Sequence, residues 1–158
     1  MNNYRLRKHI FLVLTILAVA FIFGQSLLGR ASSDTQSGRV LAAVMWLLER
    51  VGFTPDAQIT HHFVRKCAHF AEFAALGICV GGYTYNLGKL RQRQYVAFPA
   101  WLTLLVAVSD ELLQSFTGRS AQITDVVLDY AGALCGLLAV AGFLWIKNKR
   151  ARNKNHEN

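Results

Sequence analysis

The chain has 158 residues, of which 53% are hydrophobic and only 16% are Asp, Glu, Lys or Arg, and its formal net charge is +8 at pH 7. Because soluble domains carry about 25% charged residues, this composition indicates one domain with large apolar surfaces. The basic excess does not indicate a nucleic-acid-binding protein, since Lys and Arg flank apolar runs instead of sharing a face with aromatic residues. The three cysteines, Cys67, Cys79 and Cys135, match no zinc spacing and are expected to pack as small apolar side chains.

The first predicted element is an uncharged apolar segment over residues 10–28, which follows a basic head over residues 1–9. At 1.5 Å per residue, a segment of this length crosses a hydrocarbon core about 30 Å thick. A cleaved signal peptide is the alternative, but the apolar run of a signal peptide usually has about 7–15 residues. We therefore predict a retained transmembrane helix.

A shorter apolar run lies within residues 38–52 and is closed by Glu49 and Arg50. It is too short to cross a membrane, and Trp46 suits the headgroup level. We predict a short amphipathic helix on the membrane surface.

Three longer segments follow, and each is apolar over most of its length. They are predicted as transmembrane helices over residues 59–85, 95–116 and 123–146, separated by a basic turn at 86–94 and a short link at 117–122. The predicted fold class is all-α: an integral membrane bundle of four transmembrane helices plus a short interfacial helix. The domain organisation is a basic cytoplasmic head (1–9), a transmembrane domain (10–146) and a basic cytoplasmic tail (147–158), the tail being expected to be disordered.

Basic residues set the expected orientation. The head, the turn at 86–94 and the tail hold most of the Lys and Arg residues, and such clusters mark cytoplasmic segments. Both termini are therefore expected in the cytoplasm, and all acidic residues except Glu157 then lie toward the outer face.

The polar ends of the four predicted spans meet at that outer face. They comprise Gln25, Ser26, Lys66, His69, Glu72, Asp110, Glu111, Gln114, Asp125 and Asp129. Ionisable groups at membrane depth usually face a bundle interior or a water-filled cavity, so they mark a functional-site hypothesis.

The densest group of these residues lies in the stretch 65–73. On one helix Arg65, His69 and Glu72 fall within an arc of about 60°, and Lys66 widens it to about 120°, with His62 inside the wider arc. We expect Arg65, Lys66 and Arg119 to meet an anionic group. His69, Glu72 and Glu111 are the candidate acid and base residues, and Asp110, Gln114, Asp125 and Asp129 complete the ligand-binding set.

Each assignment has a structural alternative. Arg65, Glu111 and Arg119 lie near the interface, where long side chains extend to water. Lys66, His69 and Glu72 could form an ion-pair lock between helices. Asp125 could only stabilise a helix N-terminus.

A metal site is not predicted. His69 and Glu72 have the i,i+3 spacing with which helices chelate metals, but the chain has no second such pair. Lys66, in the same arc, disfavours a cation. No other cofactor is predicted.

The site residues carry a resemblance to a known family, over residues 10–145. The matching motifs are Lys66-x-x-His69-Phe70-x-Glu72-Phe73 with Leu76-Gly77, then Ser109-Asp110-Glu111-x-x-Gln114-x-Phe116, Arg119, Asp125, and Gly132-x-x-x-Gly136. In these the sequence resembles the VanZ-like family of bacterial membrane proteins, named for a teicoplanin-resistance protein. It departs from the family pattern at Phe73, where Tyr is common, and at Asp129, where Asn is common. The Gly132 and Gly136 pair would let a neighbouring helix approach closely.

The resemblance implies a multi-pass protein of the bacterial cytoplasmic membrane, associated with glycopeptide resistance and envelope physiology. It implies no particular reaction, oligomeric state or protein partner. We expect the outward-facing polar site to bind a cell-envelope component that is lipid-linked or phosphate-bearing. The alternatives are a membrane enzyme that acts on a lipid-linked envelope precursor by general acid/base catalysis, and a non-catalytic membrane scaffold.

Overall fold

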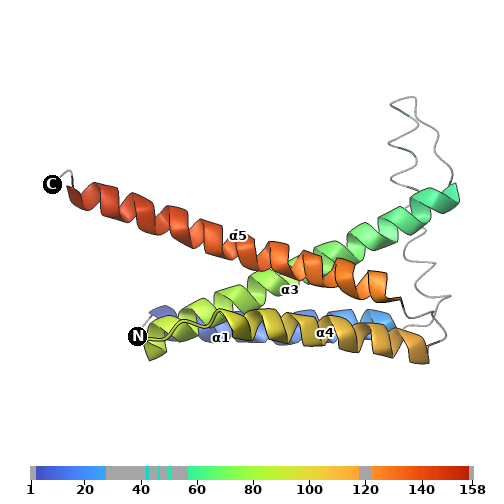
Figure 1. The fold of residues 1–158 in the computed structure, drawn as a ribbon, viewed down its shortest axis with the longest axis horizontal. Coiled ribbons are helices and arrows are strands. Elements are labelled where there is room, and N and C mark those ends of the chain that lie inside the picture. Colours follow the sequence, from blue (N-terminus) through green and yellow to red (C-terminus); the bar gives the residue numbers. More distant parts are fainter. Residues whose placement is uncertain are drawn as a thin grey trace.

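The described part of the chain is helical. A computed structural model describes residues 3–27, 57–117 and 122–156, with the backbone alone at 57–62 and 154–156, and also Ala42, Trp46 and Arg50. These residues contain four long helices and no strand: α1 (Asn3–Leu27), α3 (Ala57–Arg91), α4 (Ala97–Phe116) and α5 (Ile123–His156). Successive long helices run in opposite directions, and α5 crosses α3 (Figure 1). The predicted all-α class is confirmed.

Two of the four helices, over Asn3–Leu27 and Ile123–Asn153, are long and apolar enough to cross a membrane. The other two described helices, α3 and α4, carry Lys66, Glu72, Asp110 and Glu111 within otherwise apolar sequence. Polar and charged side chains lower the mean hydropathy of a helix, which is why these two do not qualify by composition. The arrangement of four spans stays a prediction.

Helix α3 is longer than the sequence predicted, because the expected basic turn at 86–94 is helical as far as Arg91. The chain then leaves the helix through Gln92, whose φ is 55°, and the Arg93 N–H donates to the Gly88 carbonyl at 3.1 Å. This is the Schellman arrangement that ends many helices. Upstream, the buried Asn86 stays helical by donating its side-chain amide to the Gly82 carbonyl at 2.7 Å.

The prediction of a disordered tail is wrong over residues 147–156, since α5 continues to His156. No Gly or Pro follows Gly142 to end the helix. Lys, Arg and Ala have high helix propensity, and cations near a helix C-terminus interact favourably with its dipole. The high helix propensity of Arg, Lys and Leu also allows α1 to begin at Asn3, within the basic head.

Helix α3 is central, with contacts to α1, α4 and α5. Its buried side chains Phe73, Leu76 and Val80 form the core with Ile22 of α1 and Ala107 of α4.

Helices α3 and α5 approach closely where glycine removes the side chain. A Cβ atom built on Gly136 would lie 2.1 Å from the Ala74 carbonyl oxygen, and one on Gly132 would lie 2.4 Å from that of Phe70. Gly77 is equally tight against the Ala133 backbone. The close approach predicted from Gly132-x-x-x-Gly136 is confirmed.

The predicted interfacial helix at 38–52 lies largely outside the described residues. Ala42, Trp46 and Arg50 are helical and exposed, and the Arg50 guanidinium lies 4.3 Å from the centroid of the Trp46 ring.

Candidate functional site

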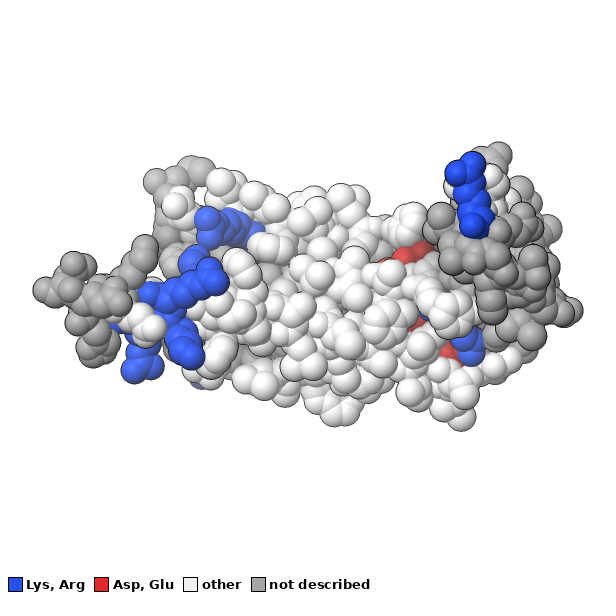
Figure 2. Space-filling view, turned by 90° about the horizontal axis from the view of Figure 1, so that it is seen from above, with Lys and Arg blue, Asp and Glu red and all other residues white. Residues whose placement is uncertain are grey.

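Charge is divided between the two ends of the molecule. In Figure 2 most visible Lys and Arg side chains gather at one end, whereas the visible Asp and Glu side chains lie toward the opposite end. The antiparallel order of the helices places the C-terminal ends of α1 and α4 beside the N-terminal parts of α3 and α5 (Figure 1). The acidic end is therefore built from all four long helices.

Asp110 joins two helices at this end. It is fully buried on α4 and accepts hydrogen bonds from Ser26 Oγ of α1 at 2.5 Å and from Gln114 Nε2, one turn along α4, at 2.7 Å. The Thr117 hydroxyl donates to the Ser26 carbonyl at 3.1 Å and ties the same two helices. A buried carboxylate needs such donors, because an unpaired charge in a low-dielectric interior is costly.

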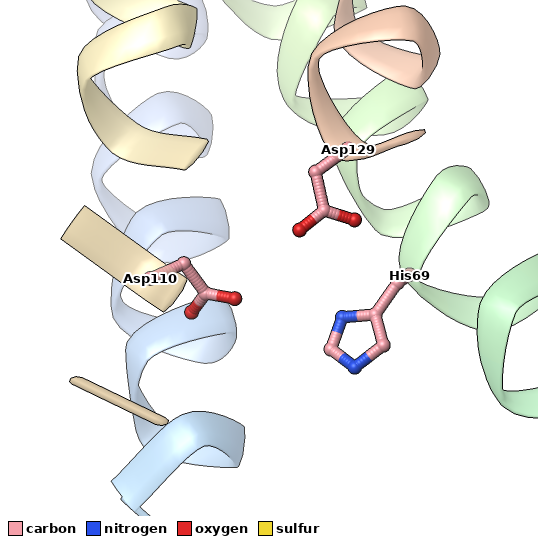
Figure 3. A group of neighbouring side chains, drawn as sticks. All are labelled: His69, Asp110 and Asp129. Atoms are coloured by element: carbon pink, nitrogen blue, oxygen red, sulfur yellow. The ribbon is translucent and has the colours of Figure 1, made fainter. Parts of the chain in front are cut away.

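Three helices contribute to a second group around Asp110. Ligand-type atoms of His69 (α3), Asp110 (α4) and Asp129 (α5) all lie within 4.8 Å of one another. Figure 3 shows the imidazole and the two carboxylates pointing toward a common centre. Asp129 is only 2% exposed, and among the described residues none donates a hydrogen bond to it or forms an ion pair with it.

His69 and Glu72 are neighbours on α3. The distance from His69 Nδ1 to Glu72 Oε2 is 3.9 Å, which is too long for a hydrogen bond but within range of an ion pair. Both side chains are partly exposed, at 19% and 25%, although the two facing atoms themselves are buried. This contact suits the predicted acid/base pair.

Two contacts join the start of α5 to its neighbours. Lys66 Nζ lies 3.2 Å from Asp125 Oδ1, and both side chains are about one-third exposed, at 32% and 27%. Glu111 Oε1 accepts a hydrogen bond from the Gln122 backbone N–H at 2.6 Å, one of the N–H groups that a helix start leaves without an internal partner. For Lys66 the ion-pair alternative thus has a direct contact to support it, with Asp125 as the partner.

The structure brings most of the predicted site residues together at one end of the bundle. They are Lys66, His69, Glu72, Asp110, Glu111, Gln114, Asp125 and Asp129, with Arg65 half-buried on the same part of α3. Arg119 and the side chain of His62 lie outside the described residues.

The ligand-binding set of the sequence analysis did not include two residues that join α1 to α4 beside Asp110. Ser26 was identified only as a polar helix end, and Thr117 was placed in a link. The i,i+4 spacing of Asp110 and Gln114 predicts their contact within α4, but no sequence pattern predicts that Ser26 pairs with Asp110.

Residues 11–146, most of the chain, match the VanZ/LLP1 family. The chain belongs to the VanZ/LLP1 family. No curated protein and no solved structure matches it. Membership of the VanZ/LLP1 family supports a VanZ-like membrane protein linked to resistance, and the two candidate spans agree with this.

The described centre of the site is rich in acids. Asp129 interacts electrostatically with Asp110, Asp125, Glu111 and Glu72, whereas the nearby Lys66 ammonium is paired with Asp125. Such a centre attracts cations and hydrogen-bond donors, and an anion would find its partners among basic side chains at the margin.

Proposed function

We propose that this VanZ/LLP1 protein spans the cytoplasmic membrane four times and binds a cell-envelope component, lipid-linked or phosphate-bearing, in its acidic-end site. The observation that carries the proposal is the joining of side chains from four separate helices in one largely buried polar cluster. Acids and an imidazole at membrane depth are costly and usually serve a ligand or an ion pathway.

The charge distribution supports a site that opens away from the cytosol. Lys and Arg gather at the end opposite the acids, and a basic excess marks cytoplasmic segments (Figure 2). In this orientation both termini lie in the cytoplasm and the polar cluster lies near the outer leaflet.

The site residues divide into two roles in this proposal. Arg65, Lys66 and Arg119 meet the anionic group at the margin. The acidic centre, which includes His69 and Glu72, accepts hydrogen bonds from hydroxyl or amino groups of the same ligand.

The proposal is tested with Lys66→Ala and Glu72→Gln, using Lys89→Ala as the matched control on the opposite end of α3. The measurements are envelope lipids that co-purify with the protein, followed by native mass spectrometry, and glycopeptide susceptibility at equal membrane abundance. Because a hydrogen bond to a charged group contributes about 1.5–3 kcal/mol, each site variant is expected to lower lipid retention about tenfold or more. Wild-type retention and susceptibility in both site variants would refute binding at this site.

A membrane enzyme is the second candidate, favoured by the 3.9 Å contact between His69 and Glu72. In this version Glu72 or Glu111 acts as the general base on a lipid-linked envelope precursor. Turnover of a labelled precursor by the purified protein, lost in His69→Ala while precursor binding is kept, would identify catalysis. Binding without turnover in the wild-type protein would leave the binding function alone.

The scaffold hypothesis predicts a different effect of the substitutions. If the charges only lock the helices, Glu72→Gln lowers thermal stability in detergent, and the resistance phenotype follows protein abundance in every variant. Loss of phenotype at unchanged abundance excludes the scaffold.

A further inference from the structure

We infer that His69, Asp110 and Asp129 form a binding site for one divalent transition-metal ion of the Mn²⁺ to Zn²⁺ type. The inference concerns the ion alone and holds whether or not the protein binds an envelope lipid. It rests on the convergence of three ligand-type side chains from α3, α4 and α5 and on the state of Asp129.

The distances suit a common ion. Ligand atoms bind such metals at about 2.0–2.2 Å, so two ligands on one ion lie at most about 4.4 Å apart. The three atoms here lie within 4.8 Å of one another, and small rotations of the side chains bring them into range. Each comes from a different helix, so the ion would join α3, α4 and α5 at their acidic end (Figure 3).

Asp129 is the observation that points to a ligand. Its side chain is 2% exposed, directed toward His69 and Asp110, and without a hydrogen bond or ion pair to any described residue. Its electrostatic neighbours, Asp110, Asp125, Glu111 and Glu72, are all acids. The ionised form of such a side chain is costly without a compensating cation, and a bound metal ion supplies that compensation.

The charge of the three ligands matches a divalent ion. A neutral imidazole and two carboxylates carry a formal charge of −2, which a divalent cation neutralises. Among the described residues, the Lys66 ammonium is one cation that could compete for this place, and it lies 3.2 Å from Asp125 instead. Lys66 shares a helical arc with His69 and Glu72, and for that reason the sequence disfavours a metal. In the folded chain the Lys66 ammonium is paired with Asp125, so this objection does not apply.

The donor set selects the type of metal. Mg²⁺ and Ca²⁺ prefer sites made only of oxygen ligands, whereas imidazole suits the later divalent transition metals. The absence of a thiolate among the three ligands makes the site less selective for soft ions. Mn²⁺ and Zn²⁺ are the appropriate test ions.

The test uses the full-length, tag-free protein in detergent, treated with chelator and then dialysed against MnCl₂ or ZnCl₂ alone. Metal content is measured by inductively coupled plasma mass spectrometry, and thermal unfolding is followed with and without metal. We expect about one ion per wild-type chain and a higher Tm with metal. His9→Ala, which removes an exposed imidazole at the opposite end of α1, is the matched control and retains both results.

Asp129→Asn separates metal binding from folding. Because Asn has the size of protonated Asp and carries no charge, the metal-free variant is expected to be as stable as wild type or more stable, while affinity for the ion falls at least tenfold and the metal-induced Tm shift disappears. His69→Ala gives the same loss of binding. Stoichiometric binding that persists in both variants, or the lack of stoichiometric binding of either ion to the wild-type protein, overturns the inference.

Discussion

Two buried aspartates in one site differ in how their charge is compensated. Asp110 accepts hydrogen bonds from Ser26 and Gln114, so the chain itself stabilises its carboxylate. A carboxylate oxygen of Asp129 lies within 4.8 Å of one of Asp110, but no described residue donates a hydrogen bond to Asp129. Removing a partner of Asp110 is therefore expected to destabilise the fold, whereas neutralising Asp129 relieves repulsion.

The contribution of the α1 contact is measured with Ser26→Ala. The substitution removes the hydroxyl that donates to Asp110, and interhelical hydrogen bonds in membrane proteins contribute about 0.6 kcal/mol on average and up to about 1.7 kcal/mol. We expect Ser26→Ala to lower the free energy of unfolding within this range. The measurement is equilibrium unfolding in mixed micelles.

Ser115→Ala is the control for this measurement. Its hydroxyl donates to the Leu112 carbonyl within α4 and is exposed, so its loss should change stability by less than about 0.5 kcal/mol. Equal effects of the two substitutions would show that the Ser26 contact to Asp110 is not a stabilising one.

Among the helices, the pairing of α3 with α5 depends on glycine. Each of the positions 77, 132 and 136 faces a backbone carbonyl of the other helix at a distance that leaves no room for a Cβ. This close contact holds His69 of α3 near Asp129 of α5, which makes helix packing a precondition of the site.

Gly136→Leu tests this dependence. A side chain at 136 must push against the Ala74 backbone, which cannot rotate away, so we expect a loss at the upper end of the usual 1–3 kcal/mol of overpacking. Thermal unfolding in detergent is the measurement, and the metal content of the variant should fall with it. Gly142→Leu, on the same helix with nothing within 4 Å, should unfold like wild type. Equal stability of the two variants would contradict close packing at 136.

At the scale of the whole molecule, charge polarity predicts the membrane orientation. The basic ends of α1, α3 and α5 gather opposite the acidic site. Because an excess of basic residues sets the orientation of a multi-span protein, this separation of charge predicts that both termini lie in the cytoplasm.

Cysteine accessibility checks the orientation in intact cells. In a background with the three native cysteines replaced, a membrane-impermeant maleimide should label Gln122→Cys and leave Lys149→Cys unlabelled until the membrane is permeabilised. Both positions are exposed in the structure, so a difference in labelling reports the side of the membrane. The reverse pattern would place the acidic site in the cytosol and remove the basis for binding an outer envelope component.

Much of this arrangement follows from the sequence. The length of the apolar segments predicts the helical class, and the order of the motifs predicts the family. The positions of the charged residues predict that the polar helix ends gather at one end of the bundle. The partners of individual side chains are not: helical periodicity gives the face of Lys66 but not the rotation of α5 that places Asp125 opposite it. Hydrophobicity shows where a helix leaves an apolar environment, but backbone hydrogen bonding can continue beyond that point. The C-terminal ends of α3 and α5 therefore lie further along the chain than the sequence predicted.

The length of α5 has a mechanical consequence. Its 34 residues extend about 50 Å, well beyond a hydrocarbon core of about 30 Å. One end of this rod carries Asp129 and the other carries a run of exposed Lys and Arg that anionic headgroups attract. Because Asp129 and this basic run belong to one continuous helix that packs on α3 through Gly132 and Gly136, a tilt of α5 at its cationic end would also move the carboxylate of Asp129.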